Sequence, residues 1–206
     1  MKRYLKWLFC LCLILLFFLI IFVVIKDNNL VFDTFIYNKI IRIKSDFFTI
    51  FFKGITFLAS VPFMVFITVL VLFFKINKKY KFIIALNMIN DVILNNFIKF
   101  IFKRQRPVDW FLVNESGYSF PSGHTMAAVC FYGLLIYLIY RSKLNKKCKV
   151  ILISLLTLLI IGIGISRIYL GVHYASDVIG GVVIALIYLI IYTTIIGAKI
   201  LNKKNT

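Results

Sequence analysis

Three short blocks of polar residues each lie beside the end of a long apolar segment. The blocks are Lys99 with Arg106 and Pro107, then Pro121, Ser122, Gly123 and His124, then Ser166, Arg167, His173 and Asp177. Together they supply three permanent cations, two histidines and a carboxylate. Cations bind phosphate oxygens and imidazoles move protons near neutral pH, so this set of groups is typical of phosphoryl transfer.

The first block supplies the positive charge. Lys99 and Arg106 are seven residues apart, which is about two helical turns, so both would project on one side if a helix continued that far. Pro107 biases Arg106 toward an extended backbone. We expect a charged clamp for an anion at the mouth of the third apolar segment. Taken alone, the pair could equally be two cations whose side chains reach the membrane surface.

The second block is a helix start. Ser122 is a favourable N-cap residue, and the free N–H groups of a helix N-terminus favour an anion. Gly123 has no side chain to keep a phosphate away. His124 would then stand beside the bound anion, where it could protonate a leaving oxygen.

The third block pairs a histidine with a carboxylate. His173 and Asp177 are four residues apart and would share a helical face if the helix has begun there. Asp177 could then accept the N–H of one ring nitrogen and leave the other unprotonated, as in a catalytic triad. His173 is therefore the better nucleophile and His124 the better acid. Ser166 and Arg167 end the preceding apolar segment.

Composition places these blocks in a membrane protein. The chain has 206 residues and is 62% hydrophobic, above the usual level for a soluble domain. A membrane-spanning helix needs about 20 apolar residues. The six predicted spans are 7–25, 55–74, 82–102, 124–140, 150–165 and 178–197, within one domain over 1–206. The first is longer than the apolar core of a signal peptide, so we expect a retained anchor. The four cysteines form neither a disulfide framework nor a metal-binding pattern.

The distribution of charge argues against nucleic-acid binding. Of the 25 Lys and Arg, 15 lie in the segments 1–6, 75–81, 141–149 and 198–206, which contain no Asp or Glu. These segments are alternate ends of a six-span bundle. The positive-inside rule therefore predicts that both termini are cytoplasmic and that the three blocks face outward.

Two other segments carry patterns. Phe32, Ile36, Ile40, Ile43 and Phe47 recur every three or four residues, which predicts an amphipathic helix at the outer membrane interface. In the third span a polar stripe has a spacing of four: Asn87, Asp91, Asn95 and Lys99. We expect its first two members to bond neighbouring helices and Lys99 to face the substrate.

The three blocks, written K-x6-R-P, P-S-G-H and S-R-x5-H-x3-D, resemble the signature of the type 2 phosphatidic acid phosphatase superfamily at all eleven specified positions. The resemblance implies an all-α bundle of six transmembrane helices with an outward-facing site that needs no metal or other cofactor. It implies that His173 forms a phosphohistidine, that Asp177 orients it and that His124 protonates the leaving group. It assigns the phosphoryl oxygens to five residues: Lys99, Arg106, Ser122, Gly123 and Arg167.

The predicted function is the dephosphorylation of a lipid in a bacterial cell membrane. We expect undecaprenyl diphosphate as the substrate, with phosphatidylglycerophosphate or phosphatidate as the alternative. Two other functions remain open: a lipid-phosphate binding or transport protein without catalysis, and a transferase that passes the phosphoryl group to an acceptor other than water.

Overall fold

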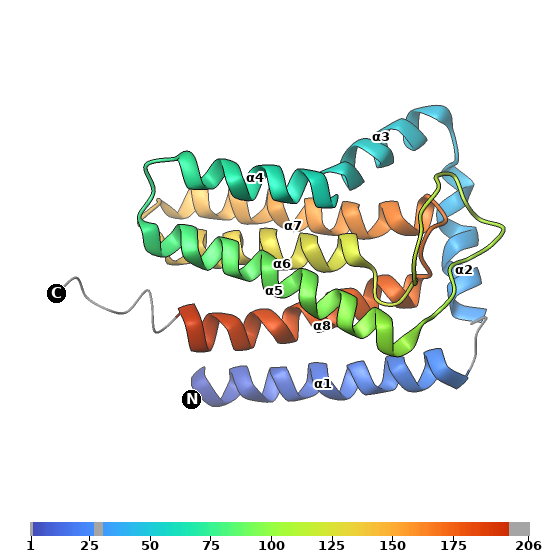
Figure 1. Ribbon diagram of the computed structural model, residues 1–206, viewed down its shortest axis with the longest axis horizontal. Helices are drawn as coiled ribbons and strands as arrows, with labels where there is room; N and C mark the ends of the chain where they lie inside the picture. The colour runs from blue at the N-terminus through green and yellow to red at the C-terminus, as the bar shows by residue number, and fades with distance from the viewer. Residues whose placement is uncertain (1, 27–30, 198–206) are drawn as a thin grey trace.

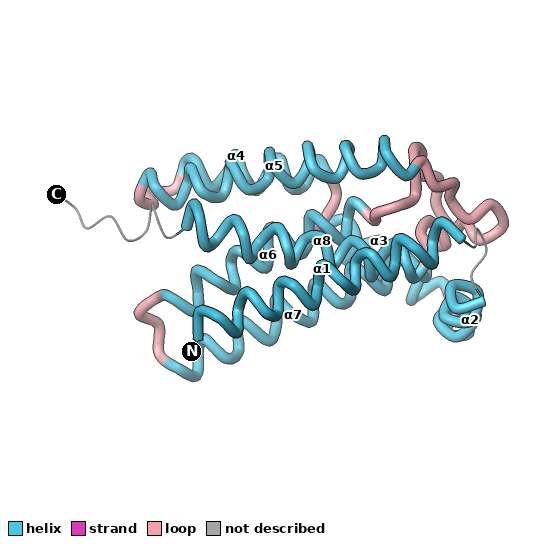
Figure 2. Tube along the Cα trace, turned by 90° about the horizontal axis from the view of Figure 1, so that it is seen from below, coloured by secondary structure: helices cyan, strands magenta, loops and turns pink. Residues whose placement is uncertain are grey.

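The computed structural model describes residues 2–26 and 31–197, and every regular element in these ranges is helical. The helices are α1 (Lys2–Lys26), α2 (Val31–Ile40), α3 (Asp46–Phe57), α4 (Val61–Phe73), α5 (Lys78–Phe102), α6 (Gly123–Arg141), α7 (Lys146–Tyr169) and α8 (Ala175–Tyr192). A 3-10 turn, Ile41–Ile43, follows α2, and a π-helical turn, Thr193–Gly197, follows α8. The long helices run side by side, whereas α2 lies across one end of the bundle (Figures 1 and 2).

Helix α6 lies at the centre of the bundle and packs against α5, α7 and α8, while α1 packs along α8. Small residues let these helices approach closely, as is common in membranes. A Cβ atom on Gly133 would come within 2.7 Å of Leu189 in α8, and one on Gly164 would meet Val178 at 3.1 Å. The buried core is therefore built around the two helices, α6 and α8, that begin at the second and third blocks.

Five of the helical segments are long and apolar enough to cross a membrane: Tyr4–Phe22, Lys78–Phe102, Gly123–Arg141, Lys146–Tyr169 and Ala175–Ile196. The predicted span over 55–74 corresponds to the end of α3 and the whole of α4, which would make a sixth span if the bent pair crosses the membrane as one. Helices α3 and α4 meet there at a 45° bend. Ser60 caps α4, accepting a hydrogen bond from Phe63 N, and Pro62 in the first turn has no N–H to donate.

The two ends of the bundle differ in charge and in the segments that lie there. The basic connections from α4 to α5 and from α6 to α7 lie at the end where α1 begins (Figure 1). Helix α2 and the long connection from α5 to α6 lie at the opposite end. The basic segment 198–206 lies outside the described residues.

Helix α2 falls in the predicted amphipathic segment but ends at Ile40, so the apolar pattern up to Phe47 does not form one helix. Its Asp33, which lies outside the apolar repeat, has only 1% of its surface exposed. This carboxylate is buried because it contacts cationic and hydroxyl partners from two other segments, Arg104 and Ser176.

Candidate active site

The three blocks meet at the α2 end of the bundle. The connection from α5 to α6, residues 103–122, folds over the ends of α7 and α8, and Leu112 N donates to Leu170 O at 3.0 Å. At the base of this connection, Ser122 N donates to Asp177 O at 3.1 Å. These backbone bonds bring the second and third blocks into contact.

His173 lies in the short connection before α8 and is 1% exposed. Its Nε2 is 3.1 Å from Arg106 Nη1, and its Nδ1 is 3.3 Å from Ser119 Oγ and 3.5 Å from Asp177 Oδ2. A guanidinium can only donate, so Nε2 accepts from Arg106 and the ring proton is on Nδ1. The structure places His173 beside Asp177, although His173 lies in a loop and the two residues do not share a helical face.

Asp177 is fully buried and has several donors around it. Its Oδ2 accepts from Ser119 Oγ at 2.5 Å and from Tyr174 N at 2.9 Å, and its Oδ1 accepts from Arg104 Nη1 at 2.5 Å. The Ser119 hydroxyl therefore lies between the carboxylate and the imidazole. The sequence interpretation missed both Ser119 and Arg104, although each stands within three residues of a motif position.

The surroundings of His173 keep its imidazole neutral. Burial, together with the nearby Arg167 and Arg106 guanidinium groups, outweighs the contact with Asp177 and lowers the pKa of His173 to about 4. A neutral imidazole whose Nε2 carries a lone pair is the form that can attack phosphorus, once that lone pair leaves its hydrogen bond with Arg106.

Arg106 is mostly occupied by backbone carbonyl groups. Its Nε donates to Gly117 O at 3.0 Å, Nη2 to Ser116 O at 3.0 Å, and Nη1 to Val172 O at 2.7 Å. Together with the contact to His173, these bonds use four of the five N–H groups of a guanidinium. One N–H therefore remains for a phosphate. The four bonds also show that Arg106 fixes the two connections around His173.

Arg167 is 2% exposed and lies beside a carboxylate that the sequence interpretation missed. Its Nη2 is 2.6 Å from Glu115 Oε2, and its Nη1 donates to Thr56 Oγ1 at 3.0 Å. Burial raises the pKa of Glu115, but the charge of Arg167, its hydrogen bond to Glu115 and the nearby His124 and Arg106 together outweigh burial and lower that pKa. The Glu115 carboxylate is thus a negative charge in contact with Arg167, the cation that was expected to bind phosphate.

Ser122 and Gly123 form the start of α6, as expected, but their contacts differ from the expectation. Ser122 holds the N-cap position without a side-chain bond to the backbone, and its Oγ accepts from Thr125 Oγ1 at 2.9 Å. A Cβ atom on Gly123 would come within 3.1 Å of Asn95 Oδ1 in α5. The glycine therefore allows α5 to approach closely. It also adds no side chain to the surface at the start of α6.

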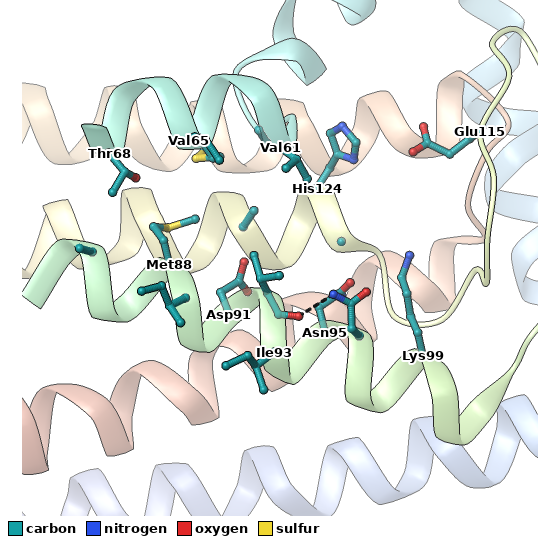
Figure 3. A pocket seen from close by; sticks show the side chains of 18 of the residues that line it. Val61, Val65, Thr68, Met88, Asp91, Ile93, Asn95, Lys99, Glu115 and His124 are labelled. Carbon is teal, nitrogen blue, oxygen red and sulfur yellow. Dashed lines mark hydrogen bonds between the residues drawn. The ribbon is translucent and has the colours of Figure 1, made fainter. Parts of the chain in front are cut away.

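A cavity of about 520 Å³ opens between α4, α5 and α6. Polar groups gather at one end, where His124, Lys99 and Glu115 face the same space (Figure 3). Arg106, Gly123 and His173 also line it, whereas Ser122, Arg167 and Asp177 do not. Most of the remaining wall is apolar: Ala59, Val61, Met64, Val65, Val69, Ala85, Met88, Ile89, Val92, Ile93 and Ala127.

The polar stripe of α5 divides between a helix contact and the cavity, and Asp91, expected at a helix contact, is on the cavity side. Asn87 Nδ2 donates to Cys130 O of α6 at 2.9 Å, which confirms an inter-helix bond. Asp91, Asn95 and Lys99 line the cavity. Within the described residues no three His, Cys, Asp or Glu side chains are placed to hold a metal ion.

Comparison with known proteins identifies the family. Residues 80–201 match the model of the PAP2 superfamily. The chain belongs to this superfamily. Its members are the phosphatases that the three blocks resemble, so the chain is a membrane lipid phosphatase, and the alternative of a binding protein without catalysis is set aside.

Relatives of this family agree over most of the chain. Phosphatidylglycerophosphatase B of Bacillus subtilis is 34% identical over 175 residues, which cover 81% of this chain and 84% of the relative. The crystal structure of a PAP2-type phosphatidylglycerophosphate phosphatase from Bacillus subtilis has a TM-score of 0.82 at 26% identity, over 95% of this chain and 98% of that one. LpxE of Aquifex aeolicus has a TM-score of 0.63 at 25% identity, over 77% and 92%.

Proposed function

We propose that this phosphatase removes the terminal phosphate of phosphatidylglycerophosphate through a phosphohistidine on His173. The observation that carries the proposal is the cavity, whose polar end is lined by His173, His124 and Lys99 and whose other walls are mostly apolar. A phosphate headgroup suits the first part and a lipid chain the second. The similarity to phosphatidylglycerophosphatase B supports this lipid ahead of undecaprenyl diphosphate.

The reaction has two displacements. In the first, Nε2 of His173 attacks phosphorus in line, a P–N bond forms, and the P–O bond to the lipid breaks. His124 gives its proton to the departing lipid oxygen. In the second, His124 takes a proton from water, the resulting hydroxide attacks phosphorus, and the P–N bond breaks to release inorganic phosphate and neutral His173.

The binding roles follow from charge and position. Lys99 and the remaining N–H of Arg106 bind phosphoryl oxygens from the cavity, and the start of α6 at Ser122 and Gly123 adds its dipole. Arg167 becomes available to the phosphate when the substrate displaces the Glu115 carboxylate. Most of the rate enhancement then comes from positioning and electrostatic stabilisation.

The site faces the outer side of the membrane in this proposal. The connections at the opposite end of the bundle are rich in Lys and Arg and contain no acid, which is the pattern of cytoplasmic loops. Labelling of single cysteines introduced at Asp109 and Lys143 in intact cells tests this. A membrane-impermeant reagent should modify the first and spare the second.

Undecaprenyl diphosphate is the second candidate. Lys99 faces the cavity separately from the buried Arg167, so a diphosphate could engage both cations. An apolar groove discriminates weakly between lipid chains. A preference for this lipid would therefore come from its second phosphate. It would be measured as a difference in KM between this lipid and the other substrates.

The experiment is phosphate release by purified protein in detergent with EDTA. The substrates are phosphatidylglycerophosphate, undecaprenyl diphosphate and phosphatidate, each with wild type and His173→Ala. We expect release from the first lipid, absent in the variant. Equal activity in the variant contradicts the nucleophile. Formation of a phosphorylated alcohol when an alcohol acceptor is added, with no release of inorganic phosphate in its absence, identifies a transferase. Release that requires a divalent ion contradicts a metal-free reaction.

A further inference from the structure

Arg104 is a second buried arginine beside the nucleophile, and its contacts differ from those of a phosphate ligand. It is 6% exposed and does not line the cavity that holds Lys99 and His124. Its Nη1 contacts Asp177 Oδ1 at 2.5 Å and Ser176 Oγ at 2.8 Å, and its Nη2 contacts Asp33 Oδ2 at 3.0 Å. The guanidinium thus bridges two carboxylates.

Asp33 reaches this network from α2, 71 residues from Arg104 and 143 residues from Ser176 along the chain. Its Oδ1 accepts from Ser176 N at 2.8 Å, and its Oδ2 accepts from Ser176 Oγ at 2.7 Å. Ser176 is in the first turn of α8, where backbone N–H groups lack helical partners. Asp33 therefore caps, from another helix, the turn that carries Asp177.

A second contact fixes the same face of α2. Tyr37, one turn after Asp33, stacks on Trp110 with ring centroids 4.1 Å apart. Trp110 packs against Tyr174 at 5.5 Å, and the Arg104 guanidinium lies 4.1 Å from the Tyr174 ring centroid. Helix α2 is thus joined to the His173 connection by a buried ion pair and by an aromatic stack.

Asp33 affects His173 through the charges of Arg104 and Asp177, which lie between them. Arg104 alone would draw the Asp177 carboxylate toward itself and neutralise it. With Asp33 as a second partner, the guanidinium is shared, and Asp177 keeps negative charge on Oδ2, the oxygen that faces Ser119 and His173. The bridge also fixes the orientation of the carboxylate, because a fork of N–H groups sets direction as well as distance.

We propose that Asp33 and Arg104 are positioning residues for catalysis, and that α2, docked through them, holds Asp177 and hence the reactive tautomer of His173. This inference rests on the proposed phosphohistidine route. It gives α2 a role in the chemical step, in addition to any role at the membrane surface.

The test compares kcat and KM for phosphatidylglycerophosphate in five variants. Asp33→Asn should lower kcat about tenfold and Arg104→Gln about a hundredfold, with KM within twofold, because small misplacements of reacting groups cost this much. Arg104→Lys should resemble Arg104→Gln, since one ammonium cannot bridge both carboxylates. Ser176→Ala, which removes only a hydroxyl, should cost about threefold. Asp46→Asn, the same change at an exposed acid of α3, should match wild type.

A double variant sharpens the result. In the Arg104→Gln background, Asp33→Asn should lower kcat by less than twofold, because the charge it balances is gone. If Asp33→Asn does not fold, the milder Ser176→Ala decides. Wild-type kcat in the Asp33, Arg104 and Ser176 variants, or a raised KM with unchanged kcat in them, overturns the inference. Absence of activity in wild type, or activity in His173→Ala, refutes the proposed function instead.

Discussion

The two histidines of the site have opposite surroundings. His173 is buried, and its two ring nitrogens contact Arg106, Ser119 and Asp177. His124 is partly exposed to the cavity, and no hydrogen bond to its ring is found among the described residues. The proposed nucleophile is therefore oriented before substrate arrives, whereas the proposed acid gains its partner only from the substrate. This contrast predicts different responses of the two residues to mutation, leaving group and pH.

Replacing the proposed acid should have the largest effect. His124→Ala should lower kcat for a lipid phosphate about 10²–10⁴-fold, the usual range for general acid–base catalysis. The loss should be much smaller with 4-nitrophenyl phosphate, whose leaving group needs no proton. Steady-state assays on both substrates measure the ratio. Equal losses would mean that His124 binds substrate and does not protonate it.

The two ends of the bundle can be compared through two arginines. Arg167→Ala should lower kcat/KM about a hundredfold, because it removes a buried cation and leaves Glu115 without its partner. Arg141→Ala, at the far end of α6, should stay within twofold of wild type. Lipid phosphatase assays on both variants check this. Similar losses would contradict the location of the site.

The neutral state of His173 predicts a pH dependence of stability. The folded chain holds its pKa at about 4, whereas an unfolded chain has the usual value near 6.5. Between these values the unfolded state binds the extra proton, so stability falls as pH drops below 6.5, by about 2 kcal/mol at pH 5. Thermal unfolding at pH 7 and pH 5 measures the change. The loss of stability between pH 7 and pH 5 should be smaller in His173→Asn than in wild type. An unchanged pH dependence in that variant would contradict a neutral His173.

The smallest expected effect concerns Glu115. Glu115→Gln should strengthen competitive inhibition by inorganic phosphate about fivefold, because the carboxylate no longer competes for Arg167. Asp109→Asn, an exposed acid in the same connection, is the matched control. Initial rates at several phosphate concentrations give both inhibition constants. Weaker inhibition in Glu115→Gln would show that Glu115 helps to bind the anion.

Much of this site could be predicted because the motif residues are close in sequence to helix ends. His124 lies at the start of α6, and the His173–Asp177 pair lies at the start of α8, with His173 just before the helix and Asp177 in its first turn. Pro62 predicts a kink in the span over 55–74, but a mostly apolar sequence does not distinguish one kinked helix from two helices that meet at 45°. Ser60 and Pro62 were the local signals of the break between α3 and α4.

The partners of the motif residues were less predictable. Asp33 is distant in sequence from Arg104 and Ser176, so its burial follows from tertiary packing that no local pattern encodes. Glu115 and Ser119 lie in a connection without regular structure, where periodicity gives no information. The phosphate-binding roles of Ser122 and Gly123 were inferred from a general property of helix starts, and they stay predictions.

The most direct test of the account is to trap the covalent intermediate. Purified protein is mixed with lipid labelled in its terminal phosphate, quenched in alkali and examined for bound label. The account predicts label that survives alkali, is lost in acid and is absent from His173→Ala. Label that persists in His173→Ala, or turnover by wild type without any bound label in either wild type or His124→Ala, would contradict a phosphohistidine on His173.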